Sequence, residues 1–314
     1  MRDYIYKRII LMIPTLIGIS ILVFLLIRLI PGTVVDQLLG LERTEEGVQA
    51  LQAYFGLDRP IHVQYLSWAS GVLRGDLGES WRSGIPVQEL ILQRLPITVQ
   101  LTVGAMIVAL LVGIPLGIVS AIKENSPLDH VARVVSLFSL SMPIFWQAAM
   151  LVLILSRLFR WAPPMRYVDP FTDPIESFRI MALPSLVLGT AVAATIMRMA
   201  RSSLLDVLRQ EYIRTARAKG LRERTVVGYH ALKNAIIPVI TVAGLQVGYL
   251  LGGTVVTEEV FTLPGVGRLV LAAIYQRDYP VVQGTVLFIA LVFMVNNLIV
   301  DLLYGYVDPR IRFS

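Results

Sequence analysis

Long runs of apolar residues alternate with polar connections along most of this 314-residue chain. An α-helix needs about 20 mainly apolar residues to cross the hydrocarbon core of a bilayer. Six segments meet this requirement, so the pattern predicts an all-α membrane protein with six transmembrane helices. The predicted spans cover residues 9–30, 96–122, 131–158, 181–200, 235–256 and 281–303.

The composition agrees with a membrane protein. Apolar residues make up 55% of the chain and charged residues 16%, with a mean hydropathy of +0.69, whereas soluble domains carry about 25% charged residues. In a membrane protein, basic residues set the orientation of the spans, and we interpret the net charge of +6 in this way. We therefore expect no nucleic-acid partner. The basic N-terminus and first apolar run resemble a secretory signal, but no small-residue cleavage site follows, so we expect a retained first span.

Side chains that commonly bind metals are scarce in this sequence. There are no cysteines, which excludes disulfides, thiolate metal sites and a cysteine nucleophile. The three histidines, His62, His130 and His230, lack the spacing of a zinc ligand set. We therefore expect no metal site and no catalytic residue in this chain.

Basic residues favour one orientation of the spans, because Lys and Arg near a span resist translocation. Basic residues precede the first span within residues 2–8. The segment 198–233 contains nine Lys or Arg residues and three acidic residues, and Arg310 and Arg312 lie near the C-terminus. Six crossings place these segments on one side, which predicts cytoplasmic N- and C-termini. The connection 157–179, which has four arginines, is external in this orientation and goes against the rule.

The connection over residues 31–95 is long and patterned, and this orientation places it outside. Thr44 followed by Glu45 and Glu46 is typical of a capped helix start, and Gly56 of a helix end. Apolar residues at helical spacing predict a second helix over 61–73. We expect a mostly helical external domain, which either packs as a cap on the membrane bundle or receives a partner protein.

The segment 204–238 carries the most specific signal. It is basic and helix-forming, and Tyr212, Ala216 and Gly220 recur at the spacing of one helical face. Gly220 permits a sharp turn of the backbone, and Leu221 restarts the apolar pattern. We predict two short cytoplasmic helices joined by a turn, with a small-residue face that docks into a groove on another protein. The alternative is a cytoplasmic loop that only binds lipid headgroups. Such a loop needs the basic residues but neither the small-residue face nor the glycine turn.

Two runs in this segment resemble the cytoplasmic coupling loop of ABC importer permeases: YIRTARAKGL at 212–221 and HALKNAIIP at 230–238. Within these permeases the chain is similar to the dipeptide/oligopeptide/nickel branch, and there to the first of its two permease types. Arg214, Thr215 and Ala216 stand where the broad importer motif has a Glu and two Ala. Further similar motifs are YIYKR at 4–8, GDLGES at 75–80, EVFTLPGVG at 259–267, RDYP at 277–280, DLLY at 301–304 and DPR at 308–310.

The resemblance implies a type I ABC importer permease fold that works by alternating access. It implies as partners a homologous second permease, two ABC ATPase subunits and an extracytoplasmic solute-binding protein. ATP and Mg would be bound by the ATPases, since this chain has no Gly-x4-Gly-Lys-Ser/Thr loop, and we expect no cofactor in the chain and no enzymatic activity of its own. The residues implied to dock on an ATPase are Glu211, Tyr212, Arg214, Thr215, Ala216, Arg217, Lys219, Gly220 and Leu221.

Two further sites are expected, one along the solute path and one outside the membrane. Polar side chains within spans usually face the bundle interior or water, so we expect Gln246 and Asn297 to approach the solute path; each could instead bond a neighbouring helix. The resemblance also suggests an external loop over 257–280 that folds back as a gate, with Phe261, Pro264 and Gly265.

The expected organisation combines these segments. The N-terminus and first span occupy 1–30, the external domain 31–95 and a five-helix permease core 96–314, with a coupling loop at 201–234 inside the core. The expected location is the bacterial or archaeal cytoplasmic membrane.

An ion-coupled secondary transporter is the main alternative. Such proteins typically show internal repeats and charged residues deep in their spans, whereas here no repeat is clear and Asp301 lies near a span end. A membrane enzyme would need converging acid, base or metal groups. The sequence leaves the solute open among dipeptides, oligopeptides, nickel chelates, glutathione and sugars, with peptides fitting the branch best.

Overall fold

The structure is a computed structural model that describes residues 2–39, 44–164 and 166–307. Asp308, Arg310 and Arg312, which belong to the predicted C-terminal motif and basic pair, lie outside these residues. The described residues form helices and connections, with one isolated β-bridge between Glu79 and Pro86. An all-α fold is therefore confirmed.

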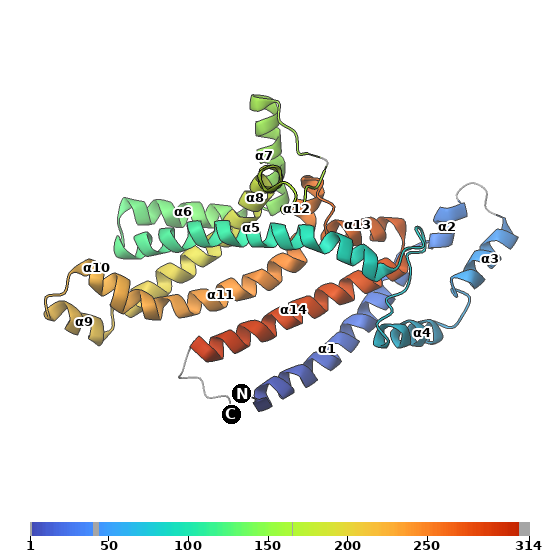
Figure 1. Ribbon diagram of the computed structural model, residues 1–314, viewed down its shortest axis with the longest axis horizontal. Helices are drawn as coiled ribbons and strands as arrows, with labels where there is room; N and C mark the ends of the chain where they lie inside the picture. The colour runs from blue at the N-terminus through green and yellow to red at the C-terminus, as the bar shows by residue number, and fades with distance from the viewer. Residues whose placement is uncertain (1, 40–43, 165, 308–314) are drawn as a thin grey trace. The chain divides into compact units, whose positions relative to one another are not determined.

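The chain divides into two compact units. The first contains Met1–Thr98 and Pro264–Met294, and the second contains Val99–Leu263 and Val295–Ser314. Two long helices, α5 (Val87–Ile122) and α14 (Tyr279–Val307), contribute residues to both units. Helices that lie wholly in the first unit are α1 (Arg2–Leu29), α2 (Val34–Leu39), α3 (Glu45–Tyr54), α4 (Ile61–Leu73) and α13 (Val266–Gln276) (Figure 1).

Two helices of the first unit begin and end where local sequence signals place them. Thr44 caps α3 by accepting a hydrogen bond from the backbone N–H of Gly47, with 3.2 Å between the atoms. After α3 the backbone reaches a φ of +64° at Gly56, a region that glycine adopts without steric penalty. The helix α4 has the predicted bounds of 61–73. The predicted helices of this segment are therefore confirmed.

The second unit is built around α8 (Pro174–Leu208). This helix packs against α6 (Pro127–Ser141), α7 (Ile144–Phe159) and α11 (Leu232–Gly253). Small residues let helices come close in this unit, as the GxxxG spacing in α5 predicts. A Cβ atom at Gly117 would lie 2.7 Å from the Ala200 Cβ of α8, and one at Gly113 would lie 2.8 Å from the Ala193 carbonyl oxygen. The other helices of this unit are α6 (Pro127–Ser141), α7 (Ile144–Phe159), α9 (Glu211–Ala218), α10 (Glu223–Thr225), the π-helix η1 (Val226–Ala231), α11 (Leu232–Gly253) and α12 (Val255–Val260).

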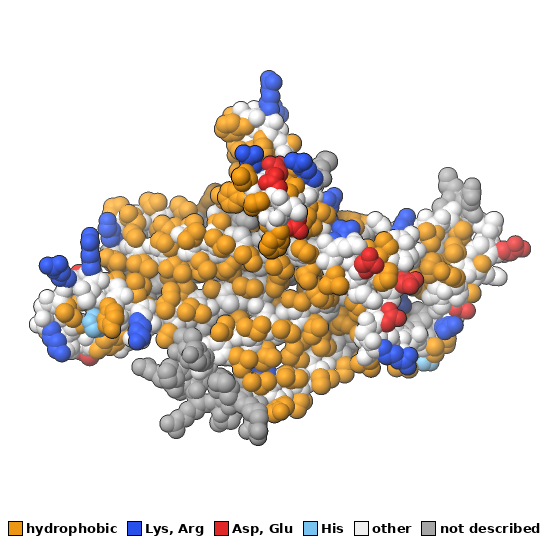
Figure 2. All heavy atoms as spheres, viewed as in Figure 1, with side chains coloured by type: hydrophobic (Ala, Val, Ile, Leu, Met, Phe, Trp, Pro, Cys, Tyr) orange, Lys and Arg blue, Asp and Glu red, His pale blue; other side chains and the backbone are white. Residues whose placement is uncertain are grey.

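Five described helices are long and apolar enough to span a membrane, and hydrophobic side chains cover their visible faces in Figure 2. The third predicted span, 131–158, is wrong as a single helix: α6 and α7 are bent by 101° at a break. Pro143 lacks a backbone N–H and disfavours helical geometry in the residue before it. Accordingly Met142 is extended, with φ −87° and ψ 128°. The count reaches six only when this bent pair is taken as one span.

Candidate functional site

The predicted coupling segment forms a compact set of short elements at the ends of two spanning helices. After α8 the chain enters α9, turns at Gly220, and continues through α10 and η1 into α11 (Figure 1). Gly220 has a φ of +74°, and a Cβ added there would meet no atom within 4 Å. The glycine is therefore needed for the turn of the backbone, and the space beside it is open.

The inner face of α9 is packed against its own chain. Ile213 is fully buried and Ala216 is 7% exposed. Both join a cluster that contains Leu204 of α8, Val226 of η1 and Ala235 of α11. Tyr212, Ala216 and Gly220 therefore do not form one helical face as predicted, because α9 ends at Ala218 and Ala216 faces the core. Their role in docking stays a prediction.

Polar contacts hold α9 to the elements that follow it. The side-chain amide of Asn234 donates to the Tyr212 hydroxyl at 2.9 Å. Arg217 donates from Nη2 to Glu223 Oε1 at 2.7 Å and from Nε to Oε2 at 3.2 Å, across the Gly220 turn. This bond to a carboxylate raises the pKa of Arg217. These contacts make the segment a stiff unit that is tied to α11.

The outer face of this segment is exposed and carries charge of both signs. Arg214 and Glu211 form an ion pair at 2.7 Å on the surface. Figure 2 shows basic side chains gathered over the end of the second unit formed by α9 and α10. Of the predicted docking residues, those exposed are Glu211, Tyr212, Arg214, Thr215, Arg217, Lys219, Gly220 and Leu221.

A buried ion pair braces the same end of the second unit. Asp129 at the start of α6 is fully buried and accepts two hydrogen bonds from Arg201 of α8, at 2.8 and 2.9 Å. Ser120 near the end of α5 and the backbone N–H of Asn125 also donate to this carboxylate. Buried charges are tolerated when they are paired and bonded in this way. The cluster joins α5, α6 and α8 beside the coupling segment, and sequence reasoning did not identify it.

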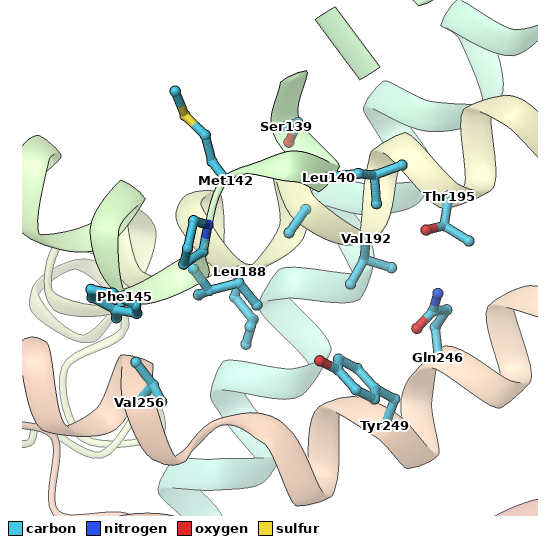
Figure 3. Close-up of a pocket in the computed structure, with 13 residues that line it drawn as sticks. Ser139, Leu140, Met142, Phe145, Leu188, Val192, Thr195, Gln246, Tyr249 and Val256 are labelled. Atoms are coloured by element: carbon cyan, nitrogen blue, oxygen red, sulfur yellow. The ribbon is translucent and has the colours of Figure 1, made fainter. Parts of the chain in front are cut away.

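A second feature of this unit is a cavity of about 570 Å³ beside the break between α6 and α7. Figure 3 shows Thr195 of α8 and Gln246 of α11 on opposite sides of it, with their side chains directed toward each other. All of its lining residues are uncharged: Ser139, Leu140, Met142, Pro143, Ile144, Phe145, Leu188, Ala191, Val192, Thr195, Gln246, Tyr249 and Val256. Gln246 therefore faces an open space, and its role in a solute path stays a prediction.

The break that shapes this cavity has its own polar support. The Gln147 side-chain amide donates to the carbonyl oxygens of Ser139 and Met142, at 2.9 and 3.0 Å. Backbone groups freed from a helix must find partners inside a bilayer. Gln147 supplies a hydrogen-bond donor to two of these carbonyl oxygens near Pro143. The backbone at the bend therefore has hydrogen-bond partners within the fold.

The other predicted path and gate residues lie elsewhere. Asn297 is on α14 and is not among the residues that line the cavity; its role stays a prediction. The predicted external loop 257–280 is largely helical, in α12 and α13, which corrects the expectation of a loop. Phe261 ends α12 and is fully buried, Pro264 is half-buried, and the buried Gly265 caps α13.

Metal ligands do not gather anywhere in the described residues. Among residues 2–39, 44–164 and 166–307, no three His, Cys, Asp or Glu side chains lie close enough together to hold an ion. The candidate sites described above are a surface segment and a cavity lined by uncharged residues.

Two family models match almost the entire chain. Residues 113–313 match the model described as "Binding-protein-dependent transport system inner membrane component". Residues 1–102 match the N-terminal model of the membrane component of such transport systems.

Curated proteins that are similar over their full length include two dipeptide transport system permease proteins, both called DppB. The one from Alkalihalophilus pseudofirmus is 43% identical, with all of both chains covered, and the one from Escherichia coli K12 is 45% identical, with 99% of each covered. The glutathione transport system permease protein GsiC of Salmonella choleraesuis is 42% identical, again with all of both chains covered.

A solved structure shares the fold. The chain matches the crystal structure of an amino acid ABC transporter with histidines, with a TM-score of 0.54. The match covers 71% of this chain and 95% of the other at 16% sequence identity. This likeness supports the predicted type I permease architecture.

Proposed function

This chain belongs to the family of binding-protein-dependent transport system inner membrane components, and we propose that it is a permease subunit that passes short peptides through an ATP-driven importer. The observation that carries the peptide assignment is the full-length similarity to the two dipeptide permeases. The ion-coupled alternative has no observation in its favour.

The neutral cavity suits this class of solute. A Gln side chain offers both a hydrogen-bond donor and an acceptor, as a peptide bond does. Gln246 and the hydroxyls of Ser139, Thr195 and Tyr249 can therefore bond the backbone of a peptide, while the apolar lining residues accept varied side chains. A cavity of this composition passes peptides without selecting strongly for one sequence.

The importer assigned here contains further subunits. A homologous permease completes the path, two ABC ATPases bind ATP and Mg on the cytoplasmic side, and an extracytoplasmic protein delivers the peptide. The basic segment 198–233 and both termini face the cytoplasm in this arrangement, as the distribution of Lys and Arg favours. The external region 31–95 then lies on the side where the peptide arrives.

The exposed face of α9 and the Gly220 turn dock on an ATPase. Because Ile213 and Ala216 bury the opposite face and Tyr212 is bonded to Asn234 of α11, a displacement of α9 moves the spanning helices with it. ATP and peptide must stabilise different states of these helices, since a ligand shifts an equilibrium only through its differential affinity. Alternating access follows from this coupling.

A pair of substitutions at Gly220 tests the docking role. Gly220→Ala and Gly220→Trp share the strain of a side chain at positive φ, and the Cβ atom of either meets no other atom within 4 Å. Only the tryptophan fills the space that an ATPase would occupy. In proteoliposomes that contain the complete importer, we expect Gly220→Trp to lose peptide uptake or ATPase assembly, with insertion kept, and Gly220→Ala to retain most of both. Normal uptake by Gly220→Trp would refute the docking role.

A further inference from the structure

A smaller cavity, separate from the one that contains Gln246, lies within the first unit. Its volume is about 280 Å³. It is formed where the end of α1, the α3–α4 connection and the start of α14 meet. Its lining residues are Arg28, Ala53, Tyr54, Phe55, Gly56, Arg59, Gln64, Ser67, Trp68, Trp81, Tyr279, Pro280 and Gln283. Among the residues that the structure describes, two arginines and no acidic residue line this space.

Arg28 is half-buried, and its partners among the described residues are neutral. Its Nε and Nη2 donate to Gln64 Oε1 at 3.2 and 3.1 Å, and its Nη1 donates to the Phe24 carbonyl oxygen at 2.9 Å. Its guanidinium carbon also lies 3.5 Å from the centroid of the Phe24 ring. Across residues 2–39, 44–164 and 166–307, Arg28 forms no ion pair with a carboxylate. Three of its five N–H groups are used, and a charge removed from water in this way normally has an anionic partner.

Other donors in the cavity also lack partners. Gln283 is 3% exposed, and its side-chain nitrogen has no hydrogen-bond acceptor among the described residues. The indole N–H of Trp68 is buried and equally without an acceptor there. Buried polar groups are usually satisfied, and each exception calls for an explanation. Two unsatisfied donors and a half-buried guanidinium in one cavity indicate a missing acceptor that carries negative charge.

We propose that this cavity binds a carboxylate group, with Arg28 and Gln283 as its principal donors. A guanidinium presents paired N–H groups that match the two oxygens of a carboxylate. Trp68, Trp81 and Tyr279 give aromatic walls for a short apolar stem. Cavities that enclose whole drug-sized ligands measure about 300–1,000 Å³, so 280 Å³ suits a single acidic side chain or chain terminus. The proposal stands independently of the peptide-transport function.

The test uses propionate, with the neutral isostere propionamide as its control. The full chain in nanodiscs is labelled with 5-fluorotryptophan, and the ¹⁹F resonances of its four tryptophans are assigned by single Trp→Phe substitutions. We expect propionate to shift the resonances of Trp68 and Trp81 in a saturable manner. Propionamide leaves them in place, and Trp146 and Trp161, which lie outside this cavity, serve as internal references.

Substitutions identify the donors. Arg28→Gln and Gln283→Leu are expected to weaken the propionate response at least about tenfold, equivalent to about 1.4 kcal/mol. Arg74→Gln removes an exposed arginine that does not line the cavity and should leave the response unchanged. If Arg28→Gln fails to fold, the exposed Arg59 provides a second variant, Arg59→Gln, which should weaken binding without loss of structure.

The results separate the proposal from its failure and distinguish two sources of the carboxylate. Equal shifts with propionate and propionamide, or an unchanged response in Gln283→Leu and Arg59→Gln, overturn it. Displacement of propionate by Ala-Leu but not by Ala-Leu amide identifies the terminus of a free peptide as the ligand. Displacement by the importer's solute-binding protein, with Ala-Leu inactive, identifies an acidic side chain of that partner.

Discussion

Tyr212 on α9 accepts a hydrogen bond from the side-chain amide of Asn234 on α11, with 2.9 Å between Asn234 Nδ2 and the tyrosine oxygen. The bond spans 22 positions in the sequence and connects the surface helix to a spanning helix. Together with the burial of Ile213, it gives α9 a fixed relation to the helices that it is proposed to move.

We predict that Tyr212→Phe lowers the number of peptides imported per ATP hydrolysed. The substitution keeps the ring and removes a hydrogen bond worth about 1 kcal/mol, so assembly should persist while α9 follows α11 less tightly. Uptake and ATP hydrolysis measured together in proteoliposomes give the ratio. Tyr229→Phe is the matched control, because that tyrosine is 72% exposed and packs beside His230; equal ratios in both variants would contradict the coupling role of Tyr212.

The buried pair of Asp129 and Arg201 is predicted to matter for stability more than any surface pair in the same region. Asp129→Ala leaves the Arg201 charge without its partner, which should lower the free energy of unfolding by about 3 kcal/mol. Removal of Glu124, which pairs with Arg209 on the surface at 3.0 Å, should change it by less than about 1 kcal/mol. Unfolding in mixed micelles measures both.

The combined variant Asp129→Leu with Arg201→Met checks the cause of that loss. Apolar replacement of both partners removes the uncompensated charge, so it should be more stable than Asp129→Ala. A double variant less stable than the single one would show that the ion pair has another role.

Gln147 is predicted to hold the bend between α6 and α7. Gln147→Leu leaves the carbonyls of Ser139 and Met142 without their side-chain donor, so we expect a loss of about 1–3 kcal/mol in the free energy of unfolding and lower peptide uptake. Gln88→Leu, at an exposed position of α5, should change neither quantity. Full stability of Gln147→Leu would mean that the bend is held by Pro143 alone.

Charge placed in the solute cavity should change which peptides pass. Gln246→Glu introduces a carboxylate into a lining without charge, so uptake of Lys-Ala should rise relative to Asp-Ala, since charges interact more strongly away from bulk water. Competition between the two labelled dipeptides measures the ratio, and Ala-Ala serves as the neutral reference. An unaltered ratio would place Gln246 away from the path.

Local signals predicted several elements correctly because neighbouring residues decide them. Thr44 and Gly56 fix the ends of α3 through side-chain capping and backbone freedom. The apolar runs predict where the long helices lie, since a bilayer crossing requires about 20 apolar residues. They do not predict the ends of α5 and α8, which have 36 and 35 residues.

Other features depend on residues far apart in the chain. Hydropathy does not register the effect of Pro143, because this effect is on backbone geometry and because proline is tolerated in many spans. The small-residue spacing of Tyr212, Ala216 and Gly220 suggested an outer face, but Ile213 and Ala216, three positions apart, form the apolar pair that packs inward. The pairing of Asp129 with Arg201, 72 positions away, has no local signature.

Photo-crosslinking tests the central claim that the outer face of α9 docks on an ATPase. p-Benzoylphenylalanine is placed singly at Thr215 and at Lys219, both exposed, and at Ser70 on α4 as an exposed control. In membranes that contain the assembled importer, irradiation should link positions 215 and 219 to the ATPase subunit and leave position 70 unlinked to it. The absence of ATPase adducts at both 215 and 219, with uptake intact before irradiation, would contradict the account.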